Sequence, residues 1–157
     1  MSLASALAAF RRLEVAADPL TPERFLRFSD AELLAIGFSR QKARYGRAIA
    51  AALVDGSLDL DDLAAVDDNG VRRTLEAIPG IGGWTSTIYL LMVLCRPDVW
   101  PAGDMALATA VGEAKGLGRR PGPAEMELLG EAWRPWRSVA ARHFWHEYLV
   151  RRRTTER

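Results

Sequence analysis

The sequence is poor in cysteine. Cys95 is the only cysteine among 157 residues, which excludes an internal disulfide, a four-cysteine cluster and a cysteine-based zinc site within the chain. We interpret Cys95 as a small, buried apolar residue. A cytosolic address is the default for a chain of this kind.

Long apolar runs are also absent. No stretch reaches the roughly 18 apolar residues that indicate a membrane span. The apolar start, residues 1–10, has neither a basic leader nor a cleavage signal, so it does not resemble a signal peptide. With 49% hydrophobic residues in 157, the chain is predicted to form one domain with a substantial core.

An excess of charge of either sign is missing as well, since the net charge is only +1. The charges are nevertheless unevenly distributed. Basic residues gather over 40–47 and again from Arg119 onward, and aspartates crowd residues 55–68. This pattern allows one basic face for DNA, and it equally allows ordinary solvated faces on a small helical protein.

Apolar residues recur at helical spacing along the chain, and the fold class that we predict is all-α. The first helix contains Leu3, Leu7 and Phe10. Caps and breakers then predict helices that begin at Thr21, at Ser29 (ending at Gly37) and at Ser39, followed by helices over 60–66, 68–77, 82–95, 103–116, 124–132 and 136–152. The charged tail, residues 151–157, is predicted to fray.

The segment from Leu75 to Thr85 predicts a helix, a tight turn and a second helix. Proline and glycine permit the turn, and bare backbone N–H groups at the start of the second helix make an anion site. A simple connector between two helices is the alternative, but the order of small and apolar residues favours a backbone clamp on a phosphate. The candidate DNA-binding residues are Pro79, Gly80, Ile81, Gly82 and Thr85.

A short motif, Pro101-Ala102-Gly103-Asp104, follows this hairpin. Aspartate after glycine is a common helix N-cap, and on its own Asp104 would be interpreted in that way. Its position downstream of a phosphate clamp favours a catalytic carboxylate in an enzyme that binds DNA.

Two of the five tryptophans, Trp84 and Trp145, are candidates for an aromatic pocket. Core packing explains either residue alone, whereas together with Asp104 they fit a pocket that stacks an extruded, electron-poor base. His143 and His146 lack a third ligand nearby in the sequence, so we do not expect a metal pair. The aromatic and basic block over residues 133–137 is interpreted as the packed start of a helix, whose arginines are also able to touch phosphates.

These motifs resemble those of the helix-hairpin-helix DNA glycosylases. The resemblance rests on residues 75–85, 101–104, 133–138 and 143–145 and covers about residues 2–148. The Pro-Trp-Arg-Ser block and residues 33–45 resemble the alkylated-base branch, the 3-methyladenine DNA glycosylase II type. The resemblance implies a single glycosylase domain over 1–157, with the hairpin motif at about 68–95.

The resemblance also implies roles for individual residues. Asp104 matches the catalytic aspartate, Trp84 and Trp145 match pocket aromatics, and the amides of Gly80 and Gly82 match phosphate-binding groups. The backbone carbonyls near Glu76, Ile78 and Ile81 match positions that in relatives hold a monovalent cation, Na⁺ or K⁺, and no other cofactor is implied. Bifunctional relatives carry a lysine nucleophile in place of Trp84, so no Schiff base and no lyase activity are expected.

The implied activity is monofunctional hydrolysis of the N-glycosidic bond of alkylated purines, such as 3-methyladenine, in base excision repair. The expected partner is double-stranded DNA that contains alkylated bases, the expected state is a monomer, and the expected location is the bacterial cytoplasm at the nucleoid. No membrane partner is expected.

The chain departs from the family in two places. Ile88, assigned to the base pocket, stands where some relatives have an aromatic residue. Residues 2–6 match the part of the family sequence that follows a helix and a wedge residue, and the wedge fills the gap left by a flipped base. We therefore expect an N-terminally truncated relative whose gene begins upstream. Two alternatives stay open, a non-catalytic DNA-binding remnant of the same fold and a helical protein-interaction fragment. A different base specificity, such as uracil or mismatched thymine, also stays open within the glycosylase class.

Overall fold

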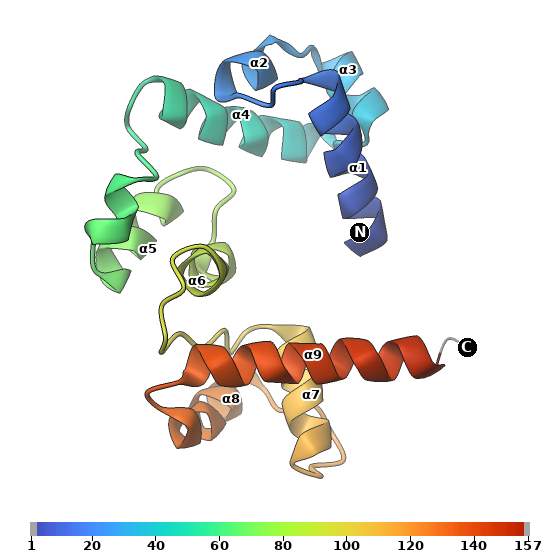
Figure 1. Ribbon diagram of the computed structural model, residues 1–157, viewed down its shortest axis with the longest axis vertical. Helices are drawn as coiled ribbons and strands as arrows, with labels where there is room; N and C mark the ends of the chain where they lie inside the picture. The colour runs from blue at the N-terminus through green and yellow to red at the C-terminus, as the bar shows by residue number, and fades with distance from the viewer. Residues whose placement is uncertain (1–2, 156–157) are drawn as a thin grey trace. The chain divides into compact units, whose positions relative to one another are not determined.

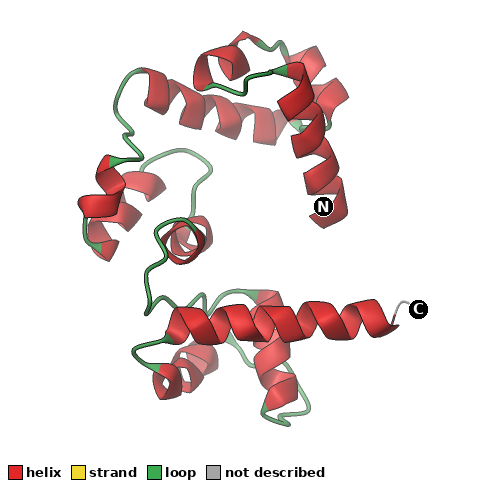
Figure 2. Cartoon of the chain, viewed as in Figure 1, coloured by secondary structure: helices red, strands yellow, loops and turns green. Residues whose placement is uncertain are grey.

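The structure is a computed structural model that describes the backbone of residues 3–155 and the side chains of residues 4–152. Within these residues the chain consists of helices and loops without strands (Figure 2), which confirms the predicted all-α class. Contacts divide the chain into two compact units, Met1–Gly82 and Gly83–Arg157 (Figure 1), and each unit is described by itself. The single domain predicted for residues 1–157 stays a prediction.

The first unit begins with four helices: α1 (Leu3–Ala16), α2 (Pro22–Arg27), α3 (Asp30–Ile36) and α4 (Arg40–Val54). Thr21, Ser29 and Ser39 each accept a backbone N–H three residues ahead, and so cap α2, α3 and α4. The structure confirms these three predicted starts, and Gly37 in the left-handed region ends α3 as expected. A 3₁₀ helix, η1 (Asp62–Ala65), and α5 (Asp68–Glu76) follow.

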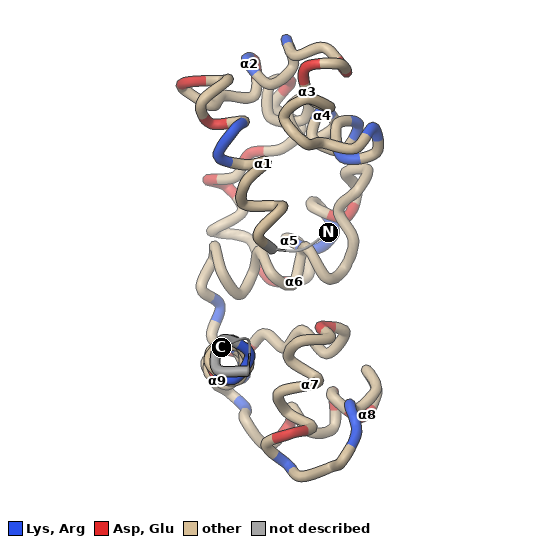
Figure 3. The backbone as a smooth tube through the Cα atoms, turned by 90° about the vertical axis from the view of Figure 1, so that its right-hand side faces the viewer, with Lys and Arg blue, Asp and Glu red and all other residues tan. Residues whose placement is uncertain are grey.

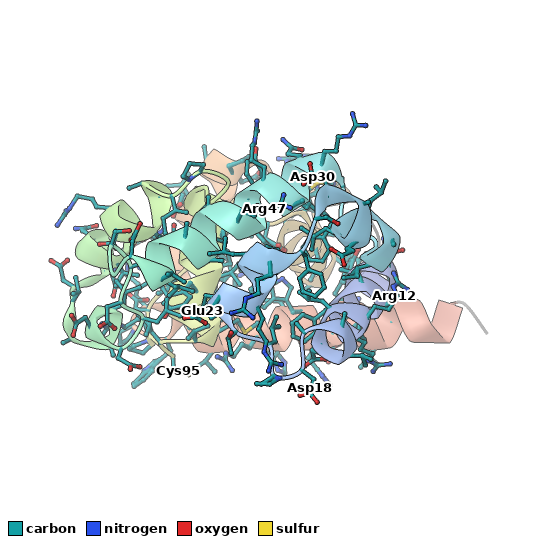
Figure 4. All side chains as sticks on the ribbon, turned by 90° about the horizontal axis from the view of Figure 1, so that it is seen from above. Arg12, Asp18, Glu23, Asp30, Arg47 and Cys95 are labelled. Atoms are coloured by element: carbon teal, nitrogen blue, oxygen red, sulfur yellow. The ribbon has the colours of Figure 1, made fainter. Side chains whose placement is uncertain are left out.

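The core of this unit forms where α2, α3 and α4 meet around Phe25 and Leu33. Gly46 allows α4 to approach α2 closely, because a Cβ there would lie 2.6 Å from Cζ of Phe25. At the rim, a guanidinium nitrogen of Arg47 lies 2.6 Å from a carboxylate oxygen of Asp30, and the other donates to the carbonyl of Phe28 (Figure 4). Lys and Arg are frequent along α4 (Figure 3).

The loop that leaves α5 ends the first unit and packs on α4. Gly80 has a φ of +96°, and a Cβ there would lie 2.2 Å from Cγ of the Tyr45 ring. Glycine is therefore required at this position for two reasons: other residues rarely adopt this positive φ, and the Tyr45 ring leaves no room for a Cβ. At Gly82, by contrast, a Cβ would meet no atom within 4 Å.

Substituting these two glycines should have unequal effects. Gly80→Ala should lower the free energy of unfolding by about 2 kcal/mol or more, because the methyl group meets both strain and the Tyr45 ring. Gly82→Ala, the matched control, should cost less than about 1 kcal/mol. Urea denaturation of both variants measures the difference, and equal losses would contradict the proposed packing of the loop.

The second unit contains α6 (Gly83–Met92), α7 (Met105–Ala114), α8 (Pro123–Gly130), the 3₁₀ helix η2 (Glu131–Trp133) and α9 (Arg137–Thr155). α7 packs along α9, and the fully buried side chains of this unit include Leu90, Leu107, Val111 and Met126. No helix among the described residues has both the length and the apolar character of a membrane span. Of the tail over residues 151–157 that is predicted to fray, residues 151–155 are helical, and residues 156 and 157 lie outside the described residues.

The prediction for Cys95 is wrong. α6 ends at Met92 rather than near residue 95, because the N–H groups of Leu94 and Arg96 turn back to the carbonyls of Tyr89 and Leu90. Cys95 falls in this turn with a φ of +52° and is exposed. Its apolar character therefore contributes nothing to the core.

Candidate active site

Asp104 caps α7 in the second unit. Its own N–H donates to the carbonyl of Pro101 at 2.9 Å, which closes a turn, and its Oδ1 accepts the N–H of Leu107 at 2.7 Å. The predicted N-cap is therefore present. The turn and the cap together fix the backbone and the side chain of this aspartate at the start of the helix.

Two indole groups approach the same carboxylate from different helices. Nε1 of Trp84, near the start of α6, donates to Oδ2 of Asp104 at 3.0 Å. Nε1 of Trp145, on α9, donates to Oδ1 at 2.9 Å. With the amide of Leu107, three N–H donors hold the carboxylate, so its orientation is set by three separate elements of the unit.

The sequence predicts that these residues meet but not how they meet. Both tryptophans are predicted to stack a base, and in the structure their indole N–H groups also bind the carboxylate. The ring of Trp84 still presents surface to solvent, since 53% of this residue is exposed, and Trp145 and Asp104 are half-buried. Ile88, half-buried and one turn after Trp84 in α6, remains a predicted pocket residue.

The predicted phosphate clamp lies in the loop that follows α5. Pro79, Gly80 and Gly82 are exposed, and no protein acceptor is recorded for the two glycine amides among the described residues. The amide of Ile81 differs, because it donates to the carbonyl of Ile78 at 3.1 Å. Thr85 is exposed in the first turn of α6, which belongs to the second unit. Binding of DNA by all five residues stays a prediction.

The predicted cation site consists of carbonyl groups from the same loop. The carbonyl of Ile78 already accepts one hydrogen bond, from Ile81, but a carbonyl oxygen has a second lone pair. Carbonyl oxygens near Glu76, Ile78 and Ile81 thus have suitable chemistry for a monovalent cation, and their role stays a prediction. His143 and His146 are exposed, and no cluster of three metal-ligating side chains occurs within the described part of the chain.

A network that the sequence analysis missed ties the loop before Asp104 to the start of α9. Nε of Arg137 lies 2.6 Å from Oδ1 of Asp98, and Nη2 lies 3.0 Å from Oδ2. These hydrogen bonds, helped by the charge of the guanidinium group, hold the pKa of the Asp98 carboxyl below its usual value, although partial burial acts in the opposite direction. Ser138 completes the network, with its side chain buried against residues 96–99.

Of the two tryptophans in the block over residues 133–137, Trp133 packs the unit as interpreted, whereas Trp136 is 61% exposed. The ring centroids of Trp133 and Trp100 are 5.1 Å apart, and those of Trp133 and Phe144 are also 5.1 Å apart. Nε1 of Trp100 donates to the carbonyl of Met126 at 2.8 Å. The block therefore joins α8, α9 and the loop that leads to Asp104.

The ion pair of Asp98 should contribute stability that disappears in acid. A carboxyl whose pKa is lowered by folding stabilises the folded state above its usual pKa of about 3.9, and the contribution is lost as the pH falls through the folded-state pKa. The difference in free energy of unfolding between the wild type and Asp98→Asn should thus shrink below about pH 4. Urea denaturation over a pH series measures it, and a difference independent of pH would refute the assignment.

The chain is thus an all-α protein in which one aspartate caps a helix downstream of two helices that a tight loop joins. Residues 1–136 match the HhH-GPD superfamily of base excision DNA repair proteins. The chain therefore belongs to this superfamily, as the resemblance of its motifs implied.

Relatives with known names are consistent with the alkylated-base branch. The chain is 38% identical over 112 residues to the "Probable bifunctional transcriptional activator/DNA repair enzyme AlkA" of Mycobacterium tuberculosis, a match that covers 71% of this chain and 21% of that protein. It is 30% identical over 128 residues to DNA-3-methyladenine glycosylase 2 of Escherichia coli, covering 80% of this chain and 42% of that protein. The chain thus spans less than half the length of these two curated relatives.

Solved structures agree with this assignment. The chain resembles the DNA-3-methyladenine glycosidase of Bacillus halodurans with a TM-score of 0.78 and 30% identity, over 94% of this chain and 69% of that one. It resembles the 3-methyladenine DNA glycosylase of Schizosaccharomyces pombe, solved in complex with abasic DNA, with a TM-score of 0.87 and 26% identity, over 92% of this chain and 72% of that one.

Proposed function

We propose that this chain is a monofunctional DNA glycosylase domain that releases alkylated purines, such as 3-methyladenine, from double-stranded DNA. The observation that carries the proposal is the carboxylate of Asp104, held by Trp84 and Trp145 in a member of a base excision repair superfamily. Such a protein would act in the cytoplasm, at the bacterial nucleoid.

Recognition would rely on the charge of the damaged base. The damaged nucleotide leaves the duplex stack, as a base must before an enzyme can reach its glycosidic bond. An alkylated purine carries a positive charge, and the exposed ring surface of Trp84 offers an electron-rich face to it. The glycosidic bond of such a base is already weak, so little acid catalysis is needed.

Asp104 would act on the sugar. As the bond to the base breaks, its electron pair leaves with the purine, which becomes neutral, and the sugar acquires oxocarbenium character. The fixed carboxylate opposes that positive charge and orients the water whose oxygen bonds to C1′ and whose proton is released. The products are the free base and an abasic site.

The hairpin loop would hold the DNA backbone. Gly80 and Gly82 are exposed residues, and a Cβ at Gly82 would meet no atom within 4 Å, so a phosphate would have room to approach this loop. Backbone donors of this kind bind without sequence preference, which suits an enzyme that must inspect many sites. A monovalent cation on the carbonyls near Glu76, Ile78 and Ile81 would add positive charge beside the phosphate.

Asp104→Asn should reduce the single-turnover rate of 3-methyladenine release from methylated duplex DNA about 100-fold or more. Asparagine removes the negative charge but keeps an oxygen for the N–H of Leu107, so the helix cap should be retained. Its amide NH2 cannot accept the indole N–H of Trp84, so the loss of that hydrogen bond should lower the unfolding temperature slightly. The matched control is Asp67→Asn, which makes the same change at the N-cap of α5, where Asp67 accepts the N–H of Gly70 at 2.6 Å.

The control variant should release base at the wild-type rate. A folded wild type that binds DNA but releases no base would replace the proposal with the non-catalytic DNA-binding remnant. A folded wild type without salt-dependent affinity for DNA would indicate a protein-interaction fragment instead.

No covalent complex with abasic DNA should form. A Schiff base with the sugar requires an amine nucleophile, and Trp84 occupies the position that a lysine holds in bifunctional relatives. The two lysines of the chain are Lys42 and Lys115, and the Lys115 ammonium lies over the Trp133 ring, 5.3 Å from its centroid. Treatment with borohydride should therefore trap nothing, and a trapped complex would disprove the monofunctional assignment.

A further inference from the structure

Two of the elements that meet at the candidate site, the loop that ends at Asp104 and α9, are also joined to each other at a distance from the site. Asp104 ends the loop that follows α6, and Trp145 lies on α9. Asp98 belongs to that loop and Ser138 to the first turn of α9. Neither makes a recorded contact with Asp104 or Trp145 among the described residues, yet both fasten the loop to the helix.

Ser138 is 4% exposed, and its hydroxyl and backbone N–H bind backbone groups of three loop residues. Its Oγ accepts the N–H of Val99 at 2.9 Å and lies 2.6 Å from the carbonyl oxygen of Arg96, to which it donates. Its backbone N–H donates to the carbonyl of Pro97 at 3.0 Å. A buried hydroxyl with this many partners fixes the position of the loop along the helix.

Asp98 binds Arg137, the residue that precedes Ser138 in α9. Its two carboxylate oxygens accept Nε and Nη2 of Arg137, and Nη2 also donates to the carbonyl of Asp98 at 2.9 Å. A two-pronged ion pair of this kind is directional as well as strong. The Arg137 side chain is only 12% exposed, which limits screening by solvent.

The segments that lead from this attachment to the site are stiff. Residues 99–102 are all buried, and Trp100 is anchored by its hydrogen bond to Met126. On α9, Trp145 follows Ser138 by seven residues, or two helical turns, so both lie on the same face of the helix. A shift of the loop along α9 would therefore change the distance between Asp104 and the Trp145 indole.

We propose that Asp98 and Ser138 are positioning residues that set the register of the loop on α9, and so hold Asp104 in hydrogen-bonding contact with Trp145. Their catalytic importance rests on the proposed function, because a carboxylate displaced by about 1 Å is expected to lose about 100-fold in rate. Their effect on the hydrogen bond does not depend on activity.

Nuclear magnetic resonance of the indole N–H groups tests the proposal. The five tryptophans give five resonances, and Trp84→Phe and Trp145→Phe assign the two at the site. In Ser138→Ala and in Asp98→Asn, the Trp145 indole should exchange with water about tenfold faster than in the wild type and shift toward the position of an unbonded indole. Arg137→Lys, which keeps the charge but loses the two-pronged geometry, should fall between.

The matched control is Glu125→Gln. It breaks another two-pronged ion pair of the second unit, in which Arg119 binds Glu125 at 2.7 and 3.0 Å, and it removes the same charge as Asp98→Asn. It should leave the Trp145 resonance and its exchange rate unchanged. If Ser138→Ala and Asp98→Asn lower the unfolding temperature while the Trp145 indole keeps the chemical shift and exchange rate that it has in Glu125→Gln, Asp98 and Ser138 only stabilise the fold and the proposal is wrong.

A kinetic measurement separates positioning from DNA binding. Ser138→Ala and Asp98→Asn should each lower the single-turnover rate of base release about tenfold or more, and their affinity for DNA should stay within twofold of the wild type. A loss of affinity at an unchanged rate would overturn the positioning role. If the wild type releases no base, the proposed function fails, and the indole measurement still decides whether the attachment controls the contact of Asp104 with Trp145.

Discussion

The geometry of the second unit depends on the hydrogen bonds that converge on one carboxylate. Asp104 accepts a backbone amide from its own helix and indole N–H groups from Trp84 and Trp145. Three helices therefore contribute to a single small group, and each oxygen of that group is oriented by a donor. A carboxylate fixed before substrate binds needs no reorganisation when positive charge develops beside it, which is the basis of electrostatic catalysis.

Much of the fold could be predicted because its determinants are local. Thr21, Ser29, Ser39 and Asp104 each stand before an apolar repeat, and a short polar side chain in that place can satisfy a helix N-terminus without help from distant residues. The end of α6 was misplaced because the turn at Cys95 depends on backbone hydrogen bonds rather than on a glycine or a proline.

The candidate site was predictable in its members but not in its contacts. Asp104, Trp84 and Trp145 carry signals of residue type, and resemblance to a family brought them together. The direction of each indole depends on how α6, α7 and α9 pack, which no local pattern specifies. The attachment of Asp98 to Arg137 was missed for the same reason, since the two residues are 39 positions apart and, in the sequence alone, each is indistinguishable from an ordinary surface charge.

The double use of Asp104, as a helix cap and as the charged group of the site, has a genetic consequence. Asparagine preserves the cap and removes the charge, so it is the replacement most compatible with a folded protein that lacks the carboxylate. The codons of aspartate and asparagine differ by one G-to-A transition. An allele that keeps the helix cap but lacks the carboxylate charge is therefore a single base change away.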